Sequence, residues 1–134
     1  MPDMDRARRV CASGELADGG IGVRFTVAVA ARDAMRDAGA FVIRYDGVAH
    51  GYLNRCAHVP MEMDWQEGQF FDSAGLYLMC ATHGAVYAPD TGHCVGGPCR
   101  GAALAKLRIE ERDGSVYWLP EPPFFPPEPN ESIA

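Results

Sequence analysis

Alternating apolar and polar residues predict a chain built mainly of β-strands. The first clear strand spans residues 23–29, where one face carries the apolar side chains of Val23, Phe25, Val27 and Val29. Residues 33–38 are expected to connect it to a second strand over 41–45. Asp46-Gly47 follows as a strong two-residue hairpin signal, which predicts a returning strand over 48–53.

The pattern changes between residues 54 and 101, where cysteine, histidine, glycine and proline concentrate. One short strand is expected here, over 76–79, and it leads directly into Cys80. Regular alternation returns over 104–110, and Asp113-Gly114 predicts a second hairpin that leads into a strand over 116–119. Only residues 13–16 suggest a helical turn. We therefore expect an all-β body interrupted by a Cys/His-rich insertion.

The last fifteen residues differ in composition from the rest of the chain. Residues 120–134 hold six prolines, so this tail is expected not to pair as a strand. Phe124 and Phe125 would pin part of it to the body, and the remainder would be mobile. The organisation predicted is one domain over 1–119, with an inserted subdomain over about 54–101, followed by the tail.

Charge and cysteine content limit the classes of function. The formal net charge of −6 argues against nucleic acid, which is bound mainly through lysine and arginine. It fits either docking onto a basic protein surface or a solvated acidic surface. No apolar run is long enough to span a membrane, and residues 1–9 lack the apolar core of a signal peptide, so we expect a cytoplasmic protein. With five cysteines in a reducing compartment, clustered Cys and His indicate metal before disulfides.

Two short motifs carry the candidate chemistry. The first is Cys56-Ala57-His58 and the second is Cys80-Ala81-Thr82-His83. Each offers one thiolate and one imidazole from a tight loop. The four side chains could bind zinc, since a Cys₂His₂ set suits a tetrahedral structural site. Common zinc patterns, however, pair two cysteines in one knuckle and two histidines in another, whereas both knuckles here are mixed.

The paired motifs resemble the Rieske pattern, C-x-H followed later by C-x-x-H. The sequence after them is also similar, since His83-Gly84 leads to the aromatic Tyr87, Asp90-Thr91-Gly92 is like the family's turn, and Gly96-Gly97-Pro98 is like its proline loop. This resemblance covers roughly residues 41–119. It implies stacked antiparallel sheets with an inserted cluster-binding subdomain of loops and short strands, and one 2Fe–2S cluster. Cys56 and Cys80 would bind one iron, and His58 and His83, with exposed imidazole edges, the other.

The charge of such a ligand set favours electron transfer. Two ferric ions, two sulfides and two thiolates sum to zero, and reduction makes the centre −1, whereas four thiolates would give −2 and −3. Adding an electron to a neutral centre costs less, which accounts for potentials of about −150 to +300 mV in Rieske centres against about −400 mV in plant-type ferredoxins.

Residues beside the ligands place the chain in the lower part of that range. High-potential members of the family have a serine two residues after the last histidine ligand, and this chain has Ala85. Hydrogen bonds to the sulfurs raise the potential, and the Tyr87 hydroxyl could still donate one to a cysteine sulfur. The positions of the disulfide that ties the two loops in high-potential members are here Met61 and Thr82, so this bridge cannot form.

The other candidate residues have plainer interpretations. Cys94 and Cys99 could form a disulfide, join His93 in a second metal site or simply pack under the proline loop. Packing under the proline loop is the preferred interpretation. Cys11 is expected to be buried, and His50 to be structural. Met61, Met63 and Trp65 would form either an apolar docking rim or core beneath the loop, and we expect surface charge from the acidic residues Glu62, Asp64 and Glu67.

The chain does not have what a self-sufficient oxygenase needs. Its remaining histidines, His50 and His93, form no D/E-x-x-H-x-x-x-x-H motif for a mononuclear iron, and no nucleotide-binding glycine fingerprint is found. The first hypothesis is a one-electron carrier, a monomer or weak oligomer, that passes electrons from a reductase to an oxygenase. The alternative is a small Rieske subunit held permanently in a larger oxygenase or nitrite reductase-type enzyme.

Overall fold

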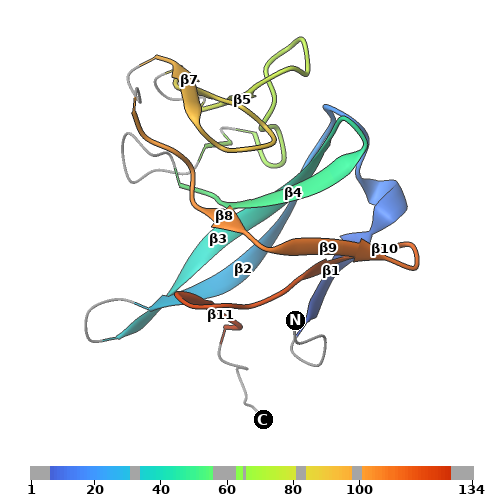
Figure 1. The fold of residues 1–134 in the computed structure, drawn as a ribbon, viewed down its shortest axis with the longest axis vertical. Helices are drawn as coiled ribbons and strands as arrows, with labels where there is room; N and C mark the ends of the chain where they lie inside the picture. Colours follow the sequence, from blue (N-terminus) through green and yellow to red (C-terminus); the bar gives the residue numbers. More distant parts are fainter. Residues whose placement is uncertain are drawn as a thin grey trace.

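The computed structural model describes residues 7–30, 34–55, 63–64, 66–80, 84–97 and 101–127. The described residues form three antiparallel sheets and one 3₁₀ turn, η2 (Ser13–Glu15), which confirms the predicted all-β class. Two sheets make a base, and the third lies beside them at one end of the molecule (Figure 1). In this part of the chain no helix is long and apolar enough to cross a membrane.

The larger base sheet has five strands in the order β11-β2-β3-β4-β8. Its strands are β2 (Val23–Ala30), β3 (Met35–Tyr45), β4 (Val48–Leu53), β8 (Lys106–Leu107) and β11 (Phe124–Phe125). The β3–β4 hairpin turns at Asp46 and Gly47, whose φ angles of 53° and 81° are those of a type I′ turn. The predicted hairpin and the predicted strand over 48–53 are therefore confirmed.

The smaller base sheet has the order β1-β10-β9. It consists of β1 (Arg8–Ala12), β9 (Ile109–Arg112) and β10 (Ser115–Trp118), and β9 and β10 are joined at Asp113 and Gly114. Its apolar face packs on the five-stranded sheet, where Trp118 contacts the core formed with Val27, Ala40 and Leu107. The base is therefore held together by apolar contacts between residues that are distant in the sequence.

A bidentate ion pair also connects the two base sheets. Arg44 on β3 donates from Nη1 and Nη2 to the two carboxylate oxygens of Glu111 on β9, over 3.0 and 2.7 Å. The same guanidinium donates to the carbonyl oxygens of Ser13 and Leu16 over 3.2 and 2.9 Å. Such paired hydrogen bonds fix orientation better than a single contact does.

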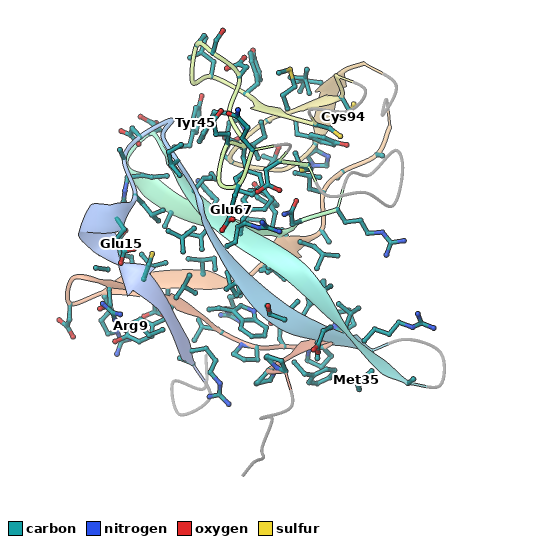
Figure 2. The ribbon with its side chains drawn as sticks, turned by 180° about the vertical axis from the view of Figure 1, so that it is seen from behind. Arg9, Glu15, Met35, Tyr45, Glu67 and Cys94 are labelled. Carbon is teal, nitrogen blue, oxygen red and sulfur yellow. The ribbon has the colours of Figure 1, made fainter. Side chains whose placement is uncertain are left out.

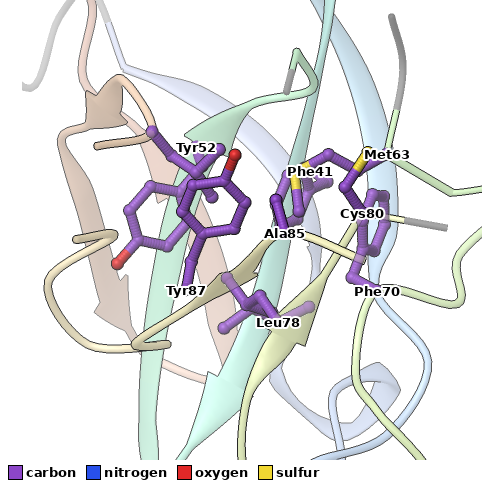
Figure 3. Close-up of a cluster of buried hydrophobic side chains, with 10 residues drawn as sticks. Phe41, Tyr52, Met63, Phe70, Leu78, Cys80, Ala85 and Tyr87 are labelled. Atoms are coloured by element: carbon purple, nitrogen blue, oxygen red, sulfur yellow. The ribbon is translucent and has the colours of Figure 1, made fainter. Parts of the chain in front are cut away.

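The third sheet comes from the Cys/His-rich insertion between β4 and β8. It has the order β5-β6-β7, with β5 (Leu78–Met79), β6 (Val86–Tyr87) and β7 (Cys94–Gly96). Its inner side chains join those of the base in one buried cluster, where the rings of Phe41 and Phe70 stack with centroids 3.7 Å apart (Figure 3). The insertion is therefore packed on the β3–β4 hairpin.

The structure corrects several of the predicted strands, including the one expected over 76–79, which is reduced to β5. Residues 35–38 belong to β3 and are not a connector, because they pair with β2 along the whole strand. The tail does pair, since Phe124 and Phe125 pair with Val29 and Ala28 at the edge of the sheet, where prolines beside a short strand are tolerated. The strand expected over 104–110 is interrupted at Arg108, and β1 was not expected at all.

Candidate metal centre

The second ligand motif begins at the end of β5. Cys80 is fully buried and, like Cys11, is not part of a disulfide. Its N–H donates to the Ala85 carbonyl oxygen over 2.8 Å, and its own carbonyl accepts the Gly84 N–H over 2.9 Å. Gly84 has a φ of +73°, in the left-handed region that favours glycine. The backbone thus closes a tight turn over 80–85, with His83 inside its span but outside the described residues.

A second segment packs directly against this turn. A Cβ at Gly97 would lie 2.9 Å from the Gly84 carbonyl oxygen and 3.0 Å from the Ala85 Cα. Only a residue without a side chain allows this approach, and the φ of +83° at Gly97 demands glycine as well. The Gly96-Gly97 segment therefore lies over the second ligand turn, as the resemblance implies. Pro98 and Cys99, which follow, lie outside the described residues.

The first ligand motif lies between two residues that are joined by hydrogen bonds. Asn54 accepts the Met63 N–H on its Oδ1 over 2.8 Å and donates from Nδ2 to Oδ1 of Asp64 over 2.9 Å. The Asn54 N–H in turn donates to the Gly39 carbonyl oxygen over 2.8 Å, on β3. Cys56 and His58 lie outside the described residues, but the two ends of their segment are fixed to each other and to the base.

Asp64 corrects one prediction from the sequence. We expected surface charge, but its side chain is fully buried. Its Oδ2 accepts the Gly68 N–H over 2.9 Å and lies 3.6 Å from Nε of Arg24. A buried carboxylate is costly unless hydrogen bonds and a cation compensate it, and both are present here. The prediction holds for Glu67, whose side chain is 79% exposed, and Glu62 lies outside the described residues.

Ala85 and Tyr87 are both fully buried in the cluster that also contains Cys80 and Leu78 (Figure 3). Ala85 presents only a methyl group to this region, so it offers no side-chain hydrogen bond to a sulfur. Met63 is also fully buried, so of its two expected roles, docking rim or core, it belongs to the core. Met61 and Trp65, the other members of the expected rim or core, lie outside the described residues.

A polar group that the sequence analysis did not single out holds the turn after β6. The Tyr52 hydroxyl donates to the Pro89 carbonyl oxygen over 2.7 Å, and Lys106 Nζ donates to the Asp90 carbonyl oxygen over 2.7 Å. Burial raises the pKa of Tyr52 and lowers the pKa of Lys106. The His50 Nδ1 lies 3.1 Å from Lys106 Nζ, and burial, then this cation, lowers the pKa of His50. His50 is therefore structural, as expected.

The remaining cysteines and histidine differ in environment. Cys11 is buried, which confirms its expected role, and burial raises the pKa of its thiol. Cys94 takes part in a disulfide bond with a partner outside the described residues, so the preferred interpretation of a plain packed thiol is wrong for Cys94. His93 is exposed, and its carbonyl oxygen accepts the Ala88 N–H over 2.9 Å.

Of the four predicted ligands, only Cys80 lies in the described part of the chain. Within that part, no three His, Cys, Asp or Glu side chains gather closely enough to hold a metal ion. What the described residues supply is the frame: a buried thiol at the end of a strand, a closed turn after it, and a fixed base for the other ligand segment. These features define a small all-β protein with an inserted subdomain, in which the ends of both predicted ligand segments are fixed by hydrogen bonds.

Comparison with known proteins gives the family. The model of the Rieske [2Fe-2S] domain matches residues 7–120, so the chain belongs to the Rieske [2Fe-2S] domain family, and its cofactor is one Rieske-type cluster. A sequence search of curated proteins gives no match.

Solved structures share the fold at low sequence identity. The ferredoxin of carbazole 1,9a-dioxygenase from Nocardioides aromaticivorans IC177 is 17% identical, with a TM-score of 0.64 over 86% of this chain and 98% of that one. The Sphingomonas yanoikuyae B1 ferredoxin is 21% identical, with a TM-score of 0.60 over 85% and 98%. The terminal oxygenase of carbazole 1,9a-dioxygenase from Novosphingobium sp. KA1 is 20% identical, with a TM-score of 0.59 over 94% of this chain but 31% of that one.

Proposed function

We propose that this chain is a Rieske ferredoxin, a one-electron carrier that passes electrons from a reductase to an oxygenase. The observation that carries the proposal is the extent of the structural match: the fold covers 98% of single-domain ferredoxin chains but 31% of a terminal oxygenase chain. A match that extends over nearly the whole of a single-domain ferredoxin fits the carrier role. A further solved structure that matches this chain contains both an oxygenase and a ferredoxin, which supports an oxygenase as one partner.

We infer that Cys56, His58, Cys80 and His83 hold the cluster. When bound, the cluster would supply a one-electron couple. The chain's own contribution is the position of the two ligand segments. The hydrogen bonds within the turn over 80–85 orient Cys80, while the bonds of Asn54 to Met63 and Asp64 fix the ends of the other segment. A frame of this kind would keep the ligand segments in place when the centre gains an electron.

The environment of Cys80 supports a potential in the low part of the Rieske range. Burial excludes water from this thiolate, and Ala85 beside it carries no hydroxyl that could donate to a sulfur. Without that hydroxyl, the reduced, more negative centre lacks one hydrogen bond that would stabilise it. We therefore expect voltammetry to give a midpoint nearer −150 mV than +300 mV, the approximate limits of these centres.

The assignment is tested by a matched pair of cysteine variants. Cys80 and Cys11 are both buried cysteines outside disulfides, but only Cys80 is a proposed ligand. Iron, acid-labile sulfide and the EPR spectrum of the dithionite-reduced protein should be lost in Cys80→Ser and kept in Cys11→Ser. A colourless wild-type protein that contains zinc would exclude the electron carrier.

The molecular size of the native material distinguishes a free carrier from a permanently bound subunit. Size-exclusion of the native material should give a freely diffusing small protein if the chain is a carrier. A stable stoichiometric complex that resists high salt would instead favour the subunit.

A further inference from the structure

The outer face of the sheet β5-β6-β7 is apolar and exposed. Leu78 and Tyr87 point inward and are fully buried, whereas their strand neighbours point the other way. The outward side chains of Tyr77, Met79 and Val95 are 42%, 36% and 55% exposed.

Val86 completes this face from the central strand. Val86 pairs with Met79 on β5 and with Gly96 on β7. The register between β6 and β7 shifts after this pair, so that Val95 lies next to Val86 without a partner of its own in the ladder. A Cβ on Gly96 would lie 3.9 Å from the Val86 Cβ, so the two residues point to the same side. We call Tyr77, Met79, Val86 and Val95 the outer apolar face. It spans all three strands and ends one residue before Cys80.

The subdomain that bears this face is acidic in sequence. Between Arg55 and Arg100 there is no lysine or arginine, whereas there are five acidic residues, of which Asp64 is buried and Glu62 lies outside the described residues. Asp72 lies directly beside the face, since its N–H donates to the Tyr77 carbonyl oxygen over 2.9 Å. An apolar surface in an acidic subdomain is complementary to a partner with an apolar centre and a basic rim.

We propose that the outer apolar face is a docking site for such a basic protein partner in electron transfer, which rests on the carrier function proposed above. The acidic surroundings would steer the partner, and the apolar side chains would hold it once water is excluded. Four side chains are too few for the roughly 1,600 Å² of a standard permanent interface, so the complex is transient. A second copy of this chain is disfavoured as the occupant, because two acidic subdomains would repel each other.

Ferricytochrome c is a suitable probe, since its apolar haem edge is ringed by lysines. Binding to the oxidised, cluster-containing protein would be measured by calorimetry at low ionic strength. Met79→Lys and Met35→Lys make a matched pair: both methionines are exposed on strands, and both changes alter the net charge equally, but Met35 lies at the far end of the base from Cys94 (Figure 2). Val95→Lys is a second variant that does not adjoin Cys80.

The proposal predicts at least a ten-fold loss of affinity in Met79→Lys and Val95→Lys, and less than a three-fold loss in Met35→Lys. Equal losses in all three would show that only net charge matters, and no loss, or no binding by the wild type, would also overturn the proposal. Equally tight binding of acidic flavodoxin, or self-association through this face in sedimentation, would overturn it too. Iron and sulfide content is measured in each sample. A protein that lacks the cluster, which would contradict the carrier function, is therefore distinguished from a protein that has the cluster but does not bind the probe.

Discussion

Asn54 and Asp64 are joined by a buried hydrogen bond of 2.9 Å from Nδ2 to Oδ1. Neither residue is a proposed ligand, yet together they close the segment that contains Cys56 and His58. The bond joins the two ends of the first ligand segment. The ends of the second motif are joined differently, by backbone hydrogen bonds of Cys80 with Gly84 and Ala85.

Removing the charge of Asp64 should weaken this closure. In Asp64→Asn an amide N–H₂ would face a donor, either the Gly68 N–H or the Asn54 amide, and Arg24 would lose its buried partner. Because an unsatisfied buried polar group costs about 1–3 kcal/mol, we expect the free energy of unfolding to fall by that amount and iron content to drop. Urea unfolding and iron analysis measure the two effects.

Glu67→Gln is the control for this change. Glu67 also lies near Arg24, at 3.9 Å, but its side chain is 79% exposed, so its pair is screened by water. We expect little change in unfolding or iron content. A loss in Glu67→Gln equal to that in Asp64→Asn would show that the burial of Asp64 is not what matters.

Ala85→Ser should raise the reduction potential. The Ala85 methyl is fully buried in the same cluster as Cys80, so a hydroxyl there would lie among apolar groups and seek an acceptor such as a cluster sulfur. A hydrogen bond to a charged group contributes about 1.5–3 kcal/mol. For one electron this corresponds to roughly 65–130 mV if the bond forms mainly with the reduced centre. Voltammetry of Ala85→Ser that shows an unchanged or lower midpoint would contradict the prediction.

Gly97→Ala should disturb the second ligand turn. The new methyl would lie 2.9 Å from the Gly84 carbonyl oxygen. Alanine would also be strained in the left-handed backbone conformation at a φ of +83°. Gly114→Ala is the matched control, since Gly114 has a φ of +78° but no atom within 4 Å of a Cβ. Both variants should lose stability, by about 1–2 kcal/mol from backbone strain. Only Gly97→Ala should change the visible and EPR spectra, and identical spectra in the two variants would refute the close approach.

Glu111 should make stability depend on pH. The hydrogen bonds from Arg44 lower the pKa of Glu111 from its ordinary value of 4.5. Because the folded-state pKa is depressed, the stabilisation is complete above the unfolded-state value near 4.5 and is lost as pH falls through the lower, folded-state pKa. Unfolding measured from pH 7 down to pH 3 should therefore show a smaller acid-dependent loss in Glu111→Gln than in the wild type.

Glu110→Gln is a suitable comparison. Glu110 pairs with Arg112 of the same strand at 2.7 Å, and because the Arg112 side chain is 49% exposed, this pair should contribute little. A pH profile that changes in Glu110→Gln but not in Glu111→Gln would mean that the ion pair between the sheets is not the source of the dependence.

The local features of this protein are predictable from its amino-acid sequence. Strand β4, both Asp-Gly hairpins and the all-β class followed from alternation and turn residues, because these signals act over a few neighbouring positions. The two mixed Cys/His motifs indicated the Rieske family in the same way, since the ligand types and their spacing lie within two short segments.

Which residues support those motifs is visible only in the folded protein. The burial of Asp64, the approach of Gly97 to Gly84, and the turn held by Tyr52 and Lys106 all join residues that no local pattern relates. The pairing of Phe124 and Phe125 was missed for the same reason, because an edge strand depends on a neighbour almost a hundred residues away. Hydrogen bonds and burial between distant segments exist only after the sheets have packed, so alternation and spacing alone cannot predict them.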